Sequence, residues 1–124
     1  MRVSSQIQHE VIDFTDKIQV PPGNGVLTIF VRHTTCGLVI NENEDRLKDD
    51  LLQAYTTLTE EVGWKHDKID NNAQAHILSS ILSPSISVPY EQGELQLGRW
   101  QRVMLVELDG PREREILVSA TERL

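Results

Sequence analysis

The apolar positions of the chain follow two different periods. Two stretches repeat them at helical spacing, which predicts one helix from Asn43 to just before Gly63 and a second over residues 73–82. Asn and Asp residues precede each stretch and can accept the free N–H groups of a first helical turn. Ser83-Pro84 should end the second helix, whereas residues 64–67 have too few apolar neighbours to predict an element.

Most of the remaining chain has the alternation or the β-branched composition of strands. Pro89 is typical of an edge strand, because proline cannot donate to a ladder. Helices do not separate the strands regularly, so we expect an α+β fold with a mainly antiparallel sheet or sandwich and two inserted helices. The link between the second and third strands is short enough for a hairpin. The expected strands cover residues 2–12, 25–32, 35–41, 86–90, 94–98, 100–108 and 114–120.

The composition is that of one globular domain covering residues 1–124, with 39% hydrophobic and 25% charged residues. The formal net charge is −7 and no Lys/Arg block stands out, so we expect no nucleic-acid partner, although a local arginine can still bind an anion. Apolar runs are too short to span a membrane and no signal-peptide pattern is present, so we expect a cytoplasmic protein without a membrane partner. Cys36 is the one cysteine, which excludes an intramolecular disulfide.

Three histidines, His33, His66 and His76, stand in polar surroundings. Neutral imidazoles favour Zn²⁺ or another transition metal, and three of them with an open position would form a catalytic metal site. No His-x-x-x-His pair is present, and the same residues can instead act as general acids and bases or donate to an anion. The spacing leaves both interpretations open.

A polar turn follows the apolar strand at 25–32, in the order His33, Thr34, Thr35 and Cys36. It is either a hairpin corner or part of a site in which hydroxyls and backbone N–H groups contact an anion. A nearby His33 would favour a Cys36 thiolate, but the two residues have opposite parity on a strand. We therefore expect Cys36 to fill space in the core.

Two further features indicate a polar or anionic ligand. Asn72, His76 and Ser80 recur at i, i+4 and i+8 of the second helix, which places a polar stripe on one face. Arg112 follows the rigid turn at Gly110-Pro111, and a guanidinium can grip phosphate oxygens as a fork. Arg114, by contrast, is expected to be solvated.

Several carboxylates are candidates for orienting the histidines, for holding a Mg²⁺ that bridges a diphosphate, or for helix capping and ion pairs. Glu107 lies among apolar strand residues and needs a partner if it is buried, for which Arg112 and Trp100 are the candidates. Trp100, beside Gln101, could also stack on a heterocycle. The carboxylates in question are Glu42, Asp45, Asp67 and Glu107.

Taken in order, these motifs resemble those of the YjbQ family, whose members are often labelled secondary thiamine-phosphate synthases. No single motif is specific, but the ordered set is, and it covers nearly the whole chain. The segment before Gly25 departs from the family pattern, because two prolines break it where the family often has a fuller helix; the departure concerns only the surface there. The motifs are His33-Thr34-Thr35-Cys36, Asn41-Glu42-Asn43, His66-Asp67, Asn72 with Ala75-His76, Gly93, Gly98-x-Trp100-Gln101 and Glu107-x-Asp109-Gly110-Pro111-Arg112.

The resemblance implies a β-sandwich-like domain with two main helices packed outside, and a homotrimer whose cleft lies near a subunit boundary. It also implies a transferase that joins a pyrimidine diphosphate to a thiazole phosphate and releases diphosphate, with Mg²⁺ or Zn²⁺ as candidate metals. Two alternatives stay open: a metal-dependent hydrolase using the three histidines, and a non-catalytic binder of a small anionic metabolite. For the transferase we expect catalytic roles for His33, His66, His76, Glu42 and Asp67, and substrate or phosphate contacts from Arg112, Thr34, Thr35, Asn41, Asn72, Ser80, Trp100 and Gln101.

Overall fold

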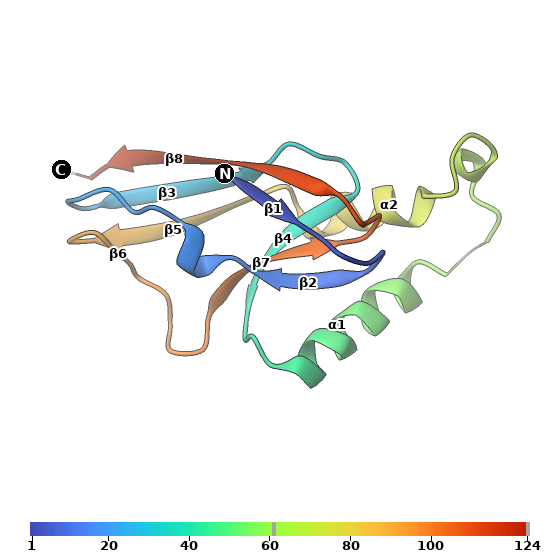
Figure 1. The fold of residues 1–124 in the computed structure, drawn as a ribbon, viewed down its shortest axis with the longest axis horizontal. Helices are drawn as coiled ribbons and strands as arrows, with labels where there is room; N and C mark the ends of the chain where they lie inside the picture. Colours follow the sequence, from blue (N-terminus) through green and yellow to red (C-terminus); the bar gives the residue numbers. More distant parts are fainter. Residues whose placement is uncertain (61, 124) are drawn as a thin grey trace.

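The structure, a computed structural model, describes residues 1–60 and 62–123 (Figure 1). Its strands are β1 (Arg2–Ser4), β2 (Glu10–Asp13), β3 (Gly25–Val31), β4 (Cys36–Asn41), β5 (Ser85–Glu91), β6 (Glu94–Leu95), β7 (Arg102–Glu107) and β8 (Glu113–Glu122). Its helices are α1 (Asp45–Leu58) and α2 (Ala73–Leu82), with 3₁₀ turns at Thr15–Lys17 and Lys65–Lys68. The strands form a five-stranded sheet in the order β1-β8-β3-β5-β6 and a three-stranded sheet in the order β2-β7-β4.

The three-stranded sheet lies between the five-stranded sheet and the helices (Figure 1). Leu38 of β4 and Leu105 of β7 pack into the cluster shared with the five-stranded sheet. Met104 and Val106 point to the other face and pack with Leu78 of α2, and α1 adds partly buried residues to that second cluster. Burial on both faces explains why this part of β7 is a continuous apolar run rather than an alternating one. The predicted α+β class with helices packed outside antiparallel sheets is confirmed.

Several local predictions need correction. Residues 2–12 form two strands in different sheets, β1 and β2, rather than one. No hairpin joins β3 to β4, because each belongs to a different sheet and the turn between them crosses from one to the other. Residues 65–68 form a 3₁₀ turn where none was predicted. Helix α1 is capped by Glu44, whose carboxylate accepts the N–H of Leu47, rather than by an asparagine.

The β4–β7 pair has two ends that matter for the candidate chemistry. At one end Cys36 pairs with Glu107, and at the other Asn41 pairs with Arg102. At about 3.3 Å per residue, six residues hold these ends roughly 17 Å apart. Groups that follow one end therefore cannot meet groups at the other within one chain.

No helix in the described ranges is both long enough and apolar enough to cross a membrane.

Candidate functional site

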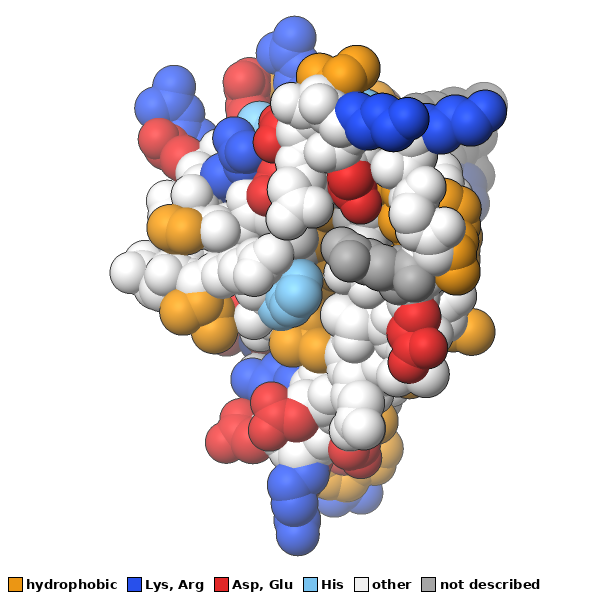
Figure 2. Space-filling view, turned by 90° about the vertical axis from the view of Figure 1, so that its right-hand side faces the viewer, with side chains coloured by type: hydrophobic (Ala, Val, Ile, Leu, Met, Phe, Trp, Pro, Cys, Tyr) orange, Lys and Arg blue, Asp and Glu red, His pale blue; other side chains and the backbone are white. Residues whose placement is uncertain are grey.

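A hollow of about 300 Å³ opens at the Cys36–Glu107 end of the β4–β7 pair. Three segments that are distant in sequence meet there: the turn between β3 and β4, the start of α2, and the loop between β7 and β8. Figure 2 views the molecule from the side where α2 lies in Figure 1, with histidine side chains visible among charged and polar groups. We call this site the His33 hollow; its lining residues are Arg32, His33, Thr34, Thr35, Asn72, His76, Asp109, Arg112 and Arg114.

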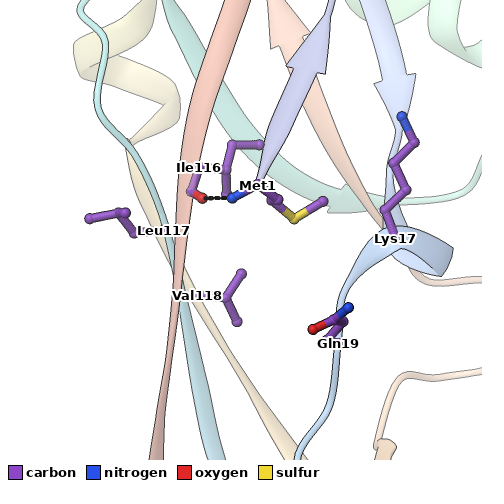
Figure 3. A pocket seen from close by; sticks show the side chains of 6 residues that line it. All are labelled: Met1, Lys17, Gln19, Ile116, Leu117 and Val118. Carbon is purple, nitrogen blue, oxygen red and sulfur yellow. Dashed lines mark hydrogen bonds between the residues drawn. The ribbon is translucent and has the colours of Figure 1, made fainter.

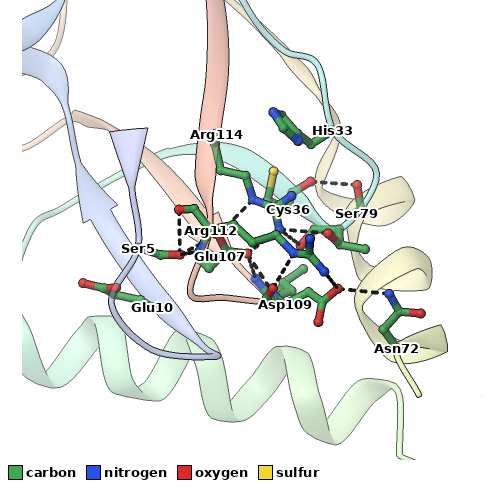
Figure 4. A network of polar contacts seen from close by, with 12 residues as sticks. Ser5, Glu10, His33, Cys36, Asn72, Ser79, Glu107, Asp109, Arg112 and Arg114 are labelled. Carbon is green, nitrogen blue, oxygen red and sulfur yellow. Dashed lines mark hydrogen bonds and ion pairs between the residues drawn. The ribbon is translucent and has the colours of Figure 1, made fainter. Parts of the chain in front are cut away.

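A buried ion pair supports the His33 hollow from below (Figure 4). Glu107 is completely buried and accepts from Nε of Arg114 at 2.9 Å and also from its Nη2. The carboxylate further accepts from Ser5 Oγ at 2.8 Å and from the backbone N–H groups of Leu108 and Asp109, each at 3.0 Å. Burial alone would raise the pKa of Glu107, but these donors outweigh it and lower the pKa, so the carboxylate stays ionised.

The same network fixes the two backbone segments that border the hollow. Arg114 Nη2 donates to the carbonyl oxygen of Thr35 at 3.0 Å and to its Oγ1 at 2.8 Å, which holds the β3–β4 turn. The Arg112 N–H donates to Ser5 Oγ at 2.9 Å, and the Ser5 N–H donates to the Arg112 carbonyl at 2.9 Å, which holds the β7–β8 loop. Only glycine fits at Gly110, because a Cβ there would lie 2.3 Å from the Ile7 carbonyl oxygen.

Arg112 begins a chain of polar contacts across the hollow. Its Nη2 lies 3.0 Å from Asp109 Oδ2, and the Asn72 amide nitrogen donates to the same oxygen at 3.0 Å. Asn72 therefore presents its oxygen to His66 Nε2, 3.0 Å away, so this nitrogen of His66 carries the proton. The His66 ring meets the His76 ring edge-on, with centroids 4.8 Å apart.

His33 is held as a neutral imidazole. Its Nε2 accepts the backbone N–H of Glu115 at 2.9 Å, so the remaining proton sits on Nδ1. Burial lowers the pKa of His33 below its ordinary 6.5, and the positive charge of Arg114 acts in the same direction. At neutral pH, His33 is therefore a donor through Nδ1 rather than a cation.

Cys36 lies in the core and takes no part in the hollow. Its side chain is fully buried, and this burial raises the pKa of the thiol to about 11. Its carbonyl accepts from Ser79 Oγ at 2.7 Å, which ties β4 to α2. The residue fills core space, as its strand parity predicted, and has none of the features of a nucleophile.

Seven residues predicted for the site do not line the His33 hollow. Glu42 and Trp100 line another hollow, of about 470 Å³, at the Asn41–Arg102 end. Gln101 closes its own loop by accepting the Gly98 N–H at 2.7 Å. The seven are Asn41, Glu42, His66, Asp67, Ser80, Trp100 and Gln101.

The other predicted residues outside the lining have structural contacts. Asn41 Oδ1 accepts the following N–H of Glu42 at 2.8 Å. Ser80 is exposed and donates to the Ile77 carbonyl at 2.7 Å within α2. Asp67 accepts the N–H of Ala73 at 3.0 Å and so caps the start of α2.

The donor geometry does not fit a metal site within one chain. In residues 1–60 and 62–123, no group of three His, Cys, Asp or Glu side chains is placed to hold an ion. Nε2 of His33 and Nε2 of His66 are each engaged in hydrogen bonds. The three-histidine Zn²⁺ site and the carboxylate Mg²⁺ site therefore have no assembled ligand set among the described residues.

Residues 1–123 match the family described as UPF0047 protein YjbQ-like. The chain belongs to the YjbQ family. A UPF0047 protein of Archaeoglobus fulgidus is 43% identical over 114 residues, which are 90% of each chain. The UPF0047 protein YugU of Bacillus subtilis is 34% identical over 128 residues, covering 96% of this chain and 95% of the relative.

Two solved structures share the fold. A YbjQ-like protein of unknown function from Sulfolobus solfataricus superposes with a TM-score of 0.93 at 39% identity, covering 99% of this chain and 94% of that one. A hypothetical protein from Aeropyrum pernix gives a TM-score of 0.90 at 36% identity, covering 99% and 96%.

Two expectations about the arginines and Glu107 were wrong. Arg114 is buried rather than solvated, and it, not Arg112 or Trp100, is the ion-pair partner of Glu107. The alternation of buried and exposed residues along β8 could have predicted the burial of Arg114, because Arg114 is two residues before the buried Ile116 and faces the same side. Arg32 and Asp109 also line the hollow, although the sequence does not predict them as site residues.

Proposed function

We propose that the His33 hollow binds the phosphate or diphosphate group of a small phosphorylated metabolite. The observation that carries this is that Arg32, Arg112 and His33 line one open hollow, in a protein whose net charge is −7. Arg32 also pairs with Glu115 at 3.1 Å. Arg112 donates hydrogen bonds to Asp109 from Nε and Nη2, while its Nη1 has no hydrogen-bond partner in the part of the chain that the structure describes. A planar guanidinium held in this way is suited to an oxygen anion.

For the chemistry, we propose a transferase that joins a pyrimidine diphosphate to a thiazole phosphate, as the family resemblance implies. The bond from the pyrimidine methylene carbon to the diphosphate oxygen breaks, and the oxygen leaves with the electron pair. The thiazole nitrogen lone pair forms the new carbon–nitrogen bond, which gives thiamine phosphate and diphosphate. Arg112, Arg32 and His33 would stabilise the charge that develops on the leaving diphosphate. No protein nucleophile is required, which agrees with the inert Cys36.

A non-catalytic anion binder would use the same donors, so binding and turnover must be measured separately. The homotrimer stays a prediction from the resemblance, and light scattering during gel filtration tests it directly. A histidine metalloenzyme has less support, because no ligand set is assembled within the described residues.

The decisive experiment compares Arg112→Gln with Arg123→Gln. Both arginines are ion-paired and both side chains are 51% exposed, but Arg123 pairs with Glu91 and does not line the His33 hollow. Calorimetric titration with inorganic diphosphate should show at least a tenfold weaker affinity for Arg112→Gln and no change for Arg123→Gln. Thiamine phosphate formed from the two substrates should fall in parallel.

The outcomes separate the two levels of the proposal. Equal diphosphate affinity in Arg112→Gln and the unmodified protein would exclude the anion site. Diphosphate binding without any thiamine phosphate, in a protein supplied with both substrates and Mg²⁺, would leave the anion site standing and remove the transferase.

A further inference from the structure

One long edge of the five-stranded sheet is paired over only part of its length. β8 has ten residues, and β1 pairs with its first three, Glu113 to Glu115. One further rung follows, in which the N–H of Ile116 donates to the Met1 carbonyl at 2.8 Å and the Met1 amine donates to the Ile116 carbonyl at 2.9 Å. Beyond Ile116, no strand among the described residues pairs with this side of β8.

The unpaired main-chain groups can be assigned from the ladder itself. In an antiparallel pair, both polar groups of one residue point to the same neighbour, and the direction alternates along the strand. Because both groups of Ile116 point towards β1, those of Val118 and Ala120 also point to this side, away from β3. They form a row of donors and acceptors in line with the existing β1–β8 ladder.

A groove runs beside these groups (Figure 3). Hollows of about 540 Å³ and 350 Å³ share Gln19 and Val118 and are therefore neighbours along the same edge. β8 forms one wall and the segment from Lys17 to Pro21 forms the other, with buried Leu27 of β3 between them. The groove thus combines open main-chain groups on one side with an apolar interior.

We propose that this groove binds an extended segment of another polypeptide, which adds to β8 as an antiparallel strand in line with β1. Main-chain hydrogen bonds to Val118 and Ala120 supply the affinity, as in other cases of strand addition. The proposal is independent of the anion site, because the groove and the His33 hollow share no lining residue.

The lining defines the partner segment. Val118 and the partly buried Val20 pack against the main core, so side chains that face inward at alternate positions should be apolar. The intervening side chains point outward to water and should be polar. Lys17 is the one charged side chain among the residues that line the two hollows, so an acidic residue near it is favoured.

Blocked six-residue peptides that alternate Val or Ile with Thr or Ser, with one Glu placed to reach Lys17, are suitable probes. Binding is measured by ¹⁵N NMR titration of the whole protein. The expected result is saturable shifts confined to β8 and to residues 17–21, with slowed hydrogen exchange at the amides of Val118 and Ala120. Peptides that shift none of these signals at millimolar concentration would overturn the proposal.

N-methylated peptides provide the matched control without altering the protein. Methylation at the residues opposite Val118 and Ala120 removes donors to β8 and should weaken binding at least tenfold. Methylation one residue away, opposite Ser119, points away from β8 and should have little effect. Equal weakening by both would show that main-chain pairing is not the mode of binding.

Ala120→Pro tests the same edge from the protein side. The N–H that it removes faces the groove rather than β3, so the β3–β8 ladder is retained and peptide affinity should fall about tenfold. Gel filtration with light scattering accompanies this variant. An assembly of the unmodified protein that dissociates in Ala120→Pro would identify the edge as a contact between copies and overturn the peptide site.

Discussion

The two ends of the β4–β7 pair carry similar ion pairs in different surroundings. At the Cys36–Glu107 end, both members of the Glu107–Arg114 pair are buried. They also form hydrogen bonds with the backbone of Leu108, Asp109 and Thr35. At the Asn41–Arg102 end, Arg102 Nε donates to Asp13 at 2.7 Å and its Nη2 lies 3.1 Å from Asp16, but 34% of the Arg102 side chain is exposed. The buried pair orders the loops around it, whereas water can replace much of the exposed one.

The difference in burial between the two ion pairs indicates which end can hold a site of fixed geometry. The His33 hollow is lined by loops whose backbones are held by Glu107, Arg114 and Ser5. At the opposite end, Trp100 is 62% exposed and stacks with Arg99, whose guanidinium carbon lies 5.0 Å from the ring centroid. Under that end lies a smaller network, in which buried Thr15 donates to Asp13 and accepts the Val103 N–H, but no buried ion pair like Glu107–Arg114 is present among the described residues.

The largest effect should come from breaking the buried pair. Arg114→Met leaves the Glu107 carboxylate buried without its partner and should cost about 3–5 kcal/mol of unfolding free energy. Arg102→Met leaves Asp13 with hydrogen bonds from Thr15 and Asn43 and should cost about 1 kcal/mol. Urea unfolding measures both. Losses of equal size would remove the distinction between the two ends.

A glycine at each end gives the next largest contrast. A Cβ at Gly110 would meet the Ile7 carbonyl oxygen at 2.3 Å and Ser5 Oγ at 2.6 Å, so Gly110→Ala should cost about 1–3 kcal/mol or more. A Cβ at Gly98 would meet only the flexible end of Gln101, at 3.1 Å, and Gly98→Ala should cost less than about 0.5 kcal/mol. Thermal unfolding of the two variants is the check, and a similar melting temperature for both would contradict it.

The smallest effect is a difference in pH dependence. The pKa of His33 is lowered in the folded protein, chiefly by burial and then by Arg114, while Glu107 and Glu115 oppose the shift and Arg112 adds to it. The unfolded chain therefore binds this proton more readily. The stability that His33 contributes is present above its ordinary pKa of 6.5 and is lost as the pH falls through the folded pKa.

The Asp13 end should respond only at lower pH. Burial would raise the pKa of Asp13, but hydrogen bonds from Arg102 and Thr15 outweigh it, so its contribution is present above 3.8 and lost below. Unfolding free energies of His33→Gln and Asp13→Asn should therefore approach that of the unmodified protein in separate pH ranges, with His33 first on acidification. NMR titration of the His33 ring measures its pKa directly, and a value above 6.5 would contradict the assignment.

Local sequence signals were enough for much of the fold. Helix α2 runs from Ala73 to Leu82, as predicted, because polar residues precede it and Ser83-Pro84 ends it. β3 ends within one residue of its predicted boundary, because its β-branched run stops at a polar turn. These boundaries depend on neighbours in the sequence.

The arrangement of the site depends on pairings that local patterns do not contain. Glu107 and Arg114 lie on strands that are consecutive in sequence but belong to different sheets, and the loop that joins these strands brings the two side chains together. The motifs group Glu42 and Trp100 with His33, yet both line the hollow at the other end of the β4–β7 pair. The family resemblance identified these polar residues as one set. The register of the β4–β7 pair shows that they lie at two opposite ends of the molecule.

The burial of Cys36 has a practical consequence. With a pKa of about 11, roughly one thiol in a thousand is ionised at pH 8, and the side chain is closed to reagents. A second cysteine introduced at the exposed Thr34 or Trp100 would therefore react alone with a maleimide dye or spin label. Cys36 therefore does not need to be replaced, and each end of the molecule can be followed separately by fluorescence or electron paramagnetic resonance.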